Sequence, residues 1–150
     1  MQVIKRPSAG LYKMLIKWVT VSTVIGAITG ILVSLLELSV LDASELMLRN
    51  IAESGYIWLV PIMPFLGLTV TGVLRDRLTK LPHFHGTEEV LEAYHYRDGD
   101  LVLKDVPIKT IGSVLSIGSG GSAGLEGPSI HIGGAVGVLM KRFLDRLGIE

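Results

Sequence analysis

The feature that most constrains the fold is a run of nineteen residues, 18–36, without a charged side chain. At a rise of about 1.5 Å per residue, a helix of this length covers a hydrocarbon core of about 30 Å. Lys17 and Glu37 flank the run, and a lysine side chain can extend to the lipid head groups. We therefore predict a transmembrane helix over residues 14–41, in which the Gly26–Gly30 spacing permits close packing against a neighbouring helix.

A second uncharged run, 55–74, contains two prolines, Pro61 and Pro64. Membrane helices tolerate proline because neighbouring groups can satisfy the freed carbonyls, so this run predicts a second span. The polar segment 42–53 is predicted as a loop, and Arg49 is its one basic residue. Basic residues instead precede the first span and follow the second. The positive-inside rule then predicts a multi-pass protein of the cell membrane with a cytoplasmic N-terminus.

The composition agrees with a membrane protein and excludes several other classes. Charged residues make up 19% of the chain, below the quarter or so that is usual for soluble domains, and mean hydropathy is +0.52. Fourteen basic residues balance fourteen acidic ones, so no excess charge suggests nucleic acid. The absence of cysteine excludes disulfides and thiolate chemistry. We predict neither an enzyme nor a bound metal or cofactor.

The C-terminal half contains the chemically informative stretch. A short helix is predicted over 86–95, and two further helices over 102–117 and 127–147. Between residues 110 and 140 the only charged side chain is Glu126, and nine of the eighteen glycines fall within 112–137. The glycine-rich segment before Glu126 would be costly to hold helical. The helix therefore breaks there, and a new one begins at Gly127-Pro128, because proline is favoured in a first helical turn.

A helix start of this kind can bind an anion. Its unpaired N–H groups carry about half a positive charge, and amides of the preceding glycine turn can add to them as a nest. Partial charges hold a small anion without trapping it. Glu126 lies just before this start, so its carboxylate can occupy the site in place of the anion and leave it on protonation. In the alternative interpretation Glu126 is a structural N-terminal acid and the glycines serve only packing.

Two other patterns in the sequence suggest different chemistry. Residues 118–123 match the G-x-G-x-x-G/A dinucleotide pattern after a strand-like Val-Leu-Ser-Ile segment, but two preceding membrane spans do not suit that fold. His83, His85 and His95 lack an obvious carboxylate partner for a metal site. We interpret these histidines as interfacial polar residues.

Residues 118–134, GSGGSAGLEGPSIHIGG, strongly resemble the signature of the CLC family of chloride channels and proton-coupled chloride exchangers, G-(K/R)-E-G-P followed by I-G-G. The resemblance implies that Glu126 is the gating glutamate and proton acceptor. It also implies that the surrounding backbone binds the anion, at Gly124, Leu125, Gly127 and Pro128. Leu125 stands where the family usually has a basic residue, which removes a positive charge near the outer anion site.

A second segment, residues 84–89 (FHGTEE), is similar to the family motif G-S-G-I-P-E. This similarity implies that His85 and Gly86 contact the anion. His85 stands where many members have a serine, and Glu88 replaces the proline. Both departures bear on ion selectivity.

The resemblance implies an all-α, polytopic membrane protein with broken half-helices, the N-terminal part of an inverted-repeat domain. It implies transport of chloride or another small anion through the bilayer, with protons as possible partners, in a homodimer when full length. Channel and exchanger both remain open. Because the family's later anion-contacting segments do not occur in these 150 residues, the alternative is a truncated, non-transporting membrane fragment with an assembly or structural role.

Overall fold

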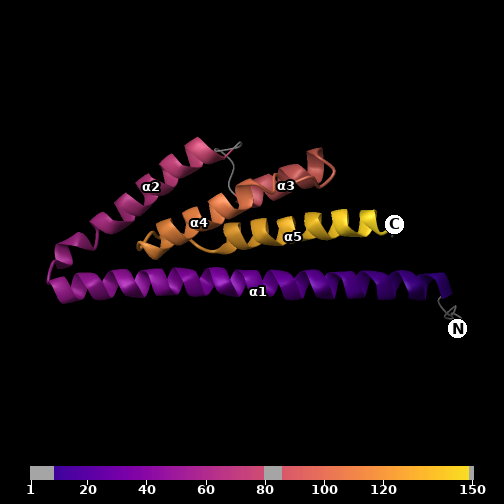
Figure 1. The fold of residues 1–150 in the computed structure, drawn as a ribbon, viewed down its shortest axis with the longest axis horizontal. Coiled ribbons are helices and arrows are strands. Elements are labelled where there is room, and N and C mark those ends of the chain that lie inside the picture. Colours follow the sequence, from indigo (N-terminus) through magenta and orange to yellow (C-terminus); the bar gives the residue numbers. More distant parts are fainter. Residues whose placement is uncertain (1–8, 80–85, 149–150) are drawn as a thin grey trace, which may run out of the picture.

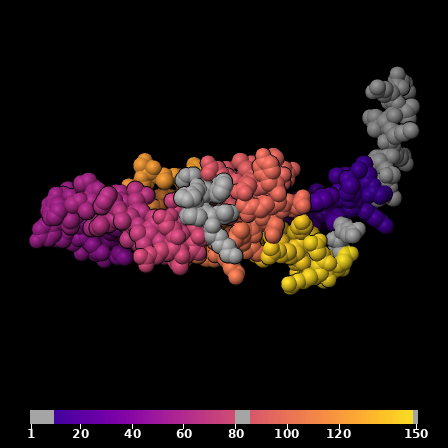
Figure 2. Space-filling view, turned by 90° about the horizontal axis from the view of Figure 1, so that it is seen from above, coloured from indigo at the N-terminus to yellow at the C-terminus, as the bar shows by residue number. Residues whose placement is uncertain are grey.

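The computed structural model describes residues 9–79 and 86–148. Within these ranges the chain forms five α-helices and one 3₁₀ turn, and no strand, so the predicted all-α class is confirmed. Figure 1 shows α1 as a long rod along one side of the molecule, with the other helices layered above it. The molecule is correspondingly elongated, as the space-filling view also shows (Figure 2).

Helix α1, Ala9–Ser54, is much longer than the span expected over 14–41. The predicted loop over 42–53 is wrong, because α1 continues through it. This segment contains neither glycine nor proline, and its charged residues recur every three or four positions, which places them along one helical face. Arg49 Nε lies 3.3 Å from Glu53 Oε1 on that face. The helix ends where Gly55 adopts a positive φ of 72°.

The second apolar run divides into two pieces instead of forming one helix over 55–74. A 3₁₀ turn covers Ile57–Leu59, and α2 covers Ile62–Leu78. Pro61 is the N-cap of α2 and Pro64 lies in its first turn, where a missing N–H costs no intrahelical hydrogen bond. The prolines thus define the start of α2 and do not kink its interior.

The remaining helices form a compact layer. Helix α3, Gly86–Tyr96, and α4, Asp105–Gly118, are followed by α5, Glu126–Arg146. Helix α4 begins three residues later than expected because Pro107 fits only into its first turn. Figure 1 shows α5 running beside α1 in the opposite direction, so that both described ends of the chain lie at one end of the molecule.

Two small apolar clusters join these helices. Leu36 and Val40 of α1 pack with Ile132 and Val136 of α5. The second cluster combines residues of α3, the loop that follows it, and α5: Ala93, Leu101, Ala135 and Val138. Together these clusters hold α5 between α1 and α3.

Most large apolar side chains of α1 and α2 face outward. Ile31, for example, is 64% exposed and Phe65 69% exposed, an arrangement that suits lipid and not water. Among the residues that the structure describes, two helical segments are long and apolar enough to cross a membrane, Gly10–Ser54 and Ile57–Leu78. Gly26 and Gly30 face open space, with nothing within 4 Å of an added Cβ. The expected close contact at this pair is therefore absent from the described part of the chain.

Candidate functional site

The site is built where α4 ends and α5 begins, and glycines allow the backbones there to approach closely. A Cβ on Gly118 would lie 2.8 Å from Cβ of Ala43 in α1. Ser44 Oγ donates a hydrogen bond of 3.1 Å to the Gly118 carbonyl, and Thr71 Oγ1 donates one of 3.1 Å to the Gly112 carbonyl. Helix α4 is thereby held between α1 and α2.

The glycine-rich turn uses its own amides to close α4. Gly120 N donates to the Ile117 carbonyl at 2.9 Å and Gly121 N to the Ser116 carbonyl at 3.0 Å, both in α4. Ala123 N donates within the turn itself, to the Gly121 carbonyl at 3.0 Å. The expected contribution of this turn to an anion nest is therefore wrong for these three amides. The last carbonyls of a helix have no intrahelical donor, and the amides of Gly120 and Gly121 donate to two carbonyls at the end of α4.

Further backbone donors belong to the start of α5. This helix begins at Glu126 itself, with Leu125 as N-cap, and not at Gly127 as expected. Ser129 N donates to the Leu125 carbonyl at 2.9 Å, which is the first intrahelical bond. Pro128 has no N–H, so it shapes the first turn but donates nothing. The N–H groups without an intrahelical acceptor are those of Leu125, Glu126 and Gly127.

The carboxylate of Glu126 folds back over the preceding turn. A Cβ built on Gly124 would overlap this carboxylate, so only glycine leaves it room. Glu126 is otherwise exposed. The structure thus brings Gly124, Leu125, Glu126, Gly127 and Pro128 together at one helix start.

Gly86 joins the same place from α3. A Cβ on Gly86 would lie 2.5 Å from the Gly127 carbonyl oxygen and 3.0 Å from Cβ of His131. The start of α3 therefore abuts the first turns of α5, and glycine is required for the contact. His85, the other residue assigned from the second motif, lies outside the described residues, as does His83.

The dinucleotide-type motif does not follow a strand, as that motif would require. The segment that matches a dinucleotide motif follows α4, and Val114–Ile117 is helical and not a strand. His95 lies in α3 with Nδ1 2.9 Å from the Leu91 carbonyl oxygen. No group of three potential metal ligands occurs within residues 9–79 and 86–148.

A buried charge cluster lies beneath the helix start, and the sequence analysis missed it. Glu89 of α3 is fully buried, and its Oε2 accepts a hydrogen bond from Lys109 Nζ of α4. His131 of α5, 1% exposed, has Nε2 3.4 Å from the same oxygen. One residue in the sequence could have indicated this cluster. His131 is the second titratable residue in the stretch 110–140, but it is not counted when only Lys, Arg, Asp and Glu are taken as charged.

A cavity of about 270 Å³ connects this cluster with the helix start. Its wall includes Gly86, Gly124 and Gly127 beside Lys109 and His131. The glycines expected to surround an anion and the buried cluster thus face one space.

Comparison with known proteins identifies the family. The family model described as voltage gated chloride channel matches residues 67–148, which is more than half of the chain and includes α3, α4 and α5. No curated protein and no solved structure matched the chain. The chain therefore belongs to the CLC family of voltage-gated chloride channels and related chloride transporters.

Proposed function

We propose that this chain forms part of a chloride pathway across the membrane and that Glu126 is its protonatable gate. The observation that supports this most directly is the carboxylate of Glu126, which folds back over Gly124 at the N-terminus of α5. An anionic group held at the positive end of a helix competes with any small anion for the same donors. Chloride enters when Glu126 is protonated and leaves the helix start.

The anion site in this proposal consists of partial charges. The N–H groups of Leu125, Glu126 and Gly127 are the donors, and Gly86 and Gly124 provide space for the ion to approach. The α5 dipole adds a favourable field, since this helix has 21 residues. His85 is proposed as a further contact from its place in the motif. Such a site releases its ion more readily than a lysine would.

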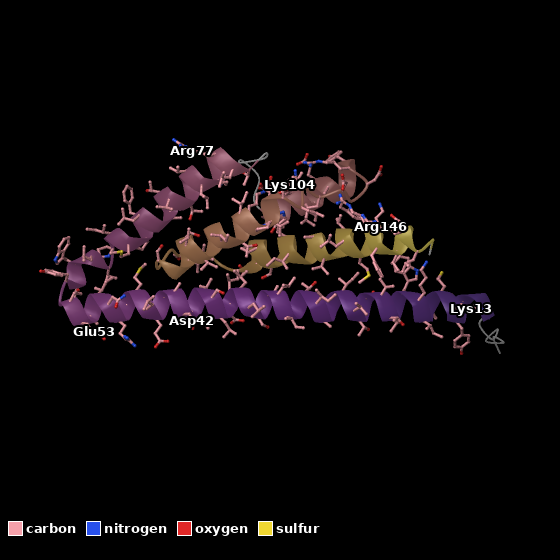
Figure 3. All side chains as sticks on the ribbon, in the orientation of Figure 1. Lys13, Asp42, Glu53, Arg77, Lys104 and Arg146 are labelled. Atoms are coloured by element: carbon pink, nitrogen blue, oxygen red, sulfur yellow. The ribbon has the colours of Figure 1, made fainter. Side chains whose placement is uncertain are left out.

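The basic residues at one end of the molecule support a cytoplasmic N-terminus. Lys13 and Arg146 lie at one end of the molecule and Glu53 at the other (Figure 3). Lys141 and Arg142 belong to the same end of α5 as Arg146. The positive-inside rule places this basic end, with the N-terminus, in the cytoplasm.

Flux measurements test the gate. In the full-length protein reconstituted in liposomes, Glu126→Gln is expected to abolish the pH dependence of chloride flux while flux itself continues, because glutamine cannot ionise. Glu45→Gln, which changes an exposed acid on α1, is the matched control and should behave as wild type. Unchanged pH dependence in Glu126→Gln would overturn the gating role.

Proton coupling and assembly are tested in the same preparation. Chloride-driven proton movement that disappears in Glu126→Gln would assign an exchanger, whereas flux without proton movement would assign a channel. Cross-linking in the bilayer tests the proposed homodimer. The second candidate is a non-transporting assembly piece, and absence of flux from the wild-type protein would support it.

A further inference from the structure

An apolar groove with a volume of about 590 Å³ lies between α1, α4 and α5. Its floor includes two buried side chains, Leu36 (3% exposed) and Ile132 (6% exposed). Its rim includes one side chain from each helix, Leu35, Ile111 and Leu139, and each of these is more than half exposed. A buried floor below an exposed rim means that the groove is open at the surface of the molecule.

Both polar side chains in the wall of this groove are already hydrogen-bonded. Among the described residues that line it, the polar ones are Ser39 and Thr110. Ser39 Oγ donates to the Leu35 carbonyl at 2.7 Å, and Thr110 Oγ1 donates to the Val106 carbonyl at 2.7 Å. A ligand therefore gains from the burial of apolar surface and has no hydrogen bond to supply. This wall selects a hydrocarbon.

The dimensions of the groove fit a hydrocarbon chain better than a helix. The lining residues of α4 extend from Leu103 to Val114, about 16 Å at 1.5 Å per residue. A helix of that length, about 10 Å wide with its side chains, would fill about 1,300 Å³. A methylene group is similar in size to a water molecule, about 30 Å³, so the 590 Å³ groove holds a chain of about twenty carbons.

Basic residues continue the groove toward the C-terminal end of α5. Arg146 follows Leu139 by seven residues, about two helical turns, so both lie on the same face of α5. The Arg146 side chain is exposed and makes no ion pair with any described residue. Residues 141–146 contain three basic side chains and one acidic side chain. A negatively charged headgroup is complementary to this end of the groove.

The distance from the groove floor to this basic end suits one leaflet of a bilayer. Ile132 and Arg146 are fourteen residues apart on α5, about 21 Å. Half of a hydrocarbon core is about 15 Å thick, and a chain that lies along an inclined helix covers a longer path. A lipid with its headgroup at Arg146 therefore has its acyl chain in the groove.

We propose that the groove between α1, α4 and α5 binds an acyl chain of an anionic phospholipid, whose headgroup lies at Arg146. The chain enters sideways from the bilayer and fills the space that the small apolar clusters leave open. Binding depends neither on chloride nor on the Glu126 gate. Only the choice of leaflet rests on the proposed orientation, since the cytoplasmic leaflet is the one rich in anionic lipid.

Native mass spectrometry of the full-length protein tests for a retained lipid. The protein, in mild detergent, is incubated with phosphatidylglycerol or with phosphatidylcholine of the same acyl chains. One phosphatidylglycerol per chain is expected to stay bound under conditions that remove phosphatidylcholine. Arg146→Gln should reduce this preference about fivefold, because it removes one positive charge at the headgroup. Arg49→Gln, at an exposed arginine near the other end of α1, is the matched control.

A variant at the rim tests the groove itself. Ile111→Trp adds bulk at the rim, and exclusion of about two methylene groups should lower lipid retention about tenfold. Ile31→Trp is the matched control, because Ile31 is 64% exposed on α1 and does not line the groove. Retention in Ile31→Trp should equal that of the wild-type protein.

Cross-linking in the wild-type protein locates the chain without relying on any variant. Liposomes of phosphatidylcholine contain phosphatidylglycerol with a diazirine in its acyl chain, and cross-links should concentrate in residues 103–114 and 132–139. Equal retention of the two lipids, or retention unchanged in Ile111→Trp, would overturn the proposal. Cross-links absent from these segments would overturn it too, and would mean that a second copy or a further segment of the protein covers the groove. None of these measurements involves flux, so failure of the Glu126 gate leaves this inference standing.

Discussion

At the scale of single residues, two glutamates of the site region lie in opposite surroundings. Glu126 is exposed at the start of α5, whereas Glu89 is fully buried between Lys109 and His131. An exposed carboxylate exchanges protons and ligands readily, and a buried one has to keep its partners. Glu126 is therefore suited to gating and Glu89 to organising its surroundings.

Gly124→Ala is expected to displace the Glu126 carboxylate from its position at the start of α5. The added Cβ would overlap the Glu126 carboxylate, so this carboxylate must move away from the helix start at every pH. Chloride flux at high pH should rise toward the level of Glu126→Gln in liposome assays. Gly137→Ala, in the following helix α5, is the control, because nothing lies within 4 Å of its added Cβ. Flux in Gly124→Ala that stays at the wild-type level would contradict this account of the gate.

Lys109→Met is expected to destabilise the fold by about 3–5 kcal/mol, because it leaves the buried Glu89 carboxylate without its cation. Thermal or denaturant unfolding in detergent measures the loss. The double variant Lys109→Met/Glu89→Gln should recover much of it, since the residue 89 side chain then carries no charge. Lys104→Met, at an exposed position just before α4, should cost little. A cost in Lys104→Met equal to that in Lys109→Met would refute the argument.

At the scale of elements, glycine contacts decide how the helices pack around the site. Gly112 and Gly118 lie on α4, where Thr71 of α2 and Ser44 of α1 donate hydrogen bonds to their carbonyls. Gly86 allows α3 to meet α5. Small residues at helix contacts let backbones approach closely in membranes, where the hydrophobic effect does not drive helix association. The site is thus positioned by close backbone contacts more than by a large core.

Gly118→Ala tests the contact between α1 and α4. The added Cβ would lie 2.8 Å from Cβ of Ala43, and overpacking of this kind costs about 1–3 kcal/mol. Ala43→Gly should restore part of the loss in a double-mutant cycle measured by thermal unfolding, because it removes the opposing atom. Gly26→Ala, whose added Cβ meets nothing within 4 Å, should be neutral or stabilising. If the changes in the free energy of unfolding caused by Gly118→Ala and Ala43→Gly simply add in the double variant, the two positions do not interact.

At the scale of the whole molecule, the length of α1 determines how the chain can sit in a bilayer. Its 46 residues extend about 70 Å at 1.5 Å per residue, more than twice a hydrocarbon core of about 30 Å. The helix must therefore tilt or project from the membrane. Its basic end, shared with α5, and its opposite end near Glu53 are then far apart (Figure 3).

Cysteine labelling tests the proposed orientation, and the chain is convenient for it because it contains no cysteine. In intact cells, a membrane-impermeant maleimide should label Glu53→Cys but reach Lys13→Cys and Arg146→Cys only after permeabilisation. The reason is that the basic end is expected in the cytoplasm. Labelling of Lys13→Cys from outside would reverse the orientation, and labelling of both ends of α1 from one side would exclude a spanning α1.

The amino-acid sequence by itself determined the class of fold and the break before α5, whereas the gating role of Glu126 stays a prediction. These follow from local properties: uncharged runs long enough for a membrane, glycines that disfavour a helix and a proline that fits a first turn. Local properties also explain why the predicted loop over 42–53 is wrong. The polarity of this segment suggested a loop, but its residues are compatible with a helix and continue α1.

Only the tertiary structure decided which distant residues share the site. Glu89, Lys109 and His131 come from three helices, and no spacing in the sequence relates them. The tertiary structure also decided whether the turn amides are open to an anion. Two of them instead donate to carbonyls at the end of α4. The physical reason is common to both: charge pairing and hydrogen-bond satisfaction depend on distances across the fold, which local pattern does not contain.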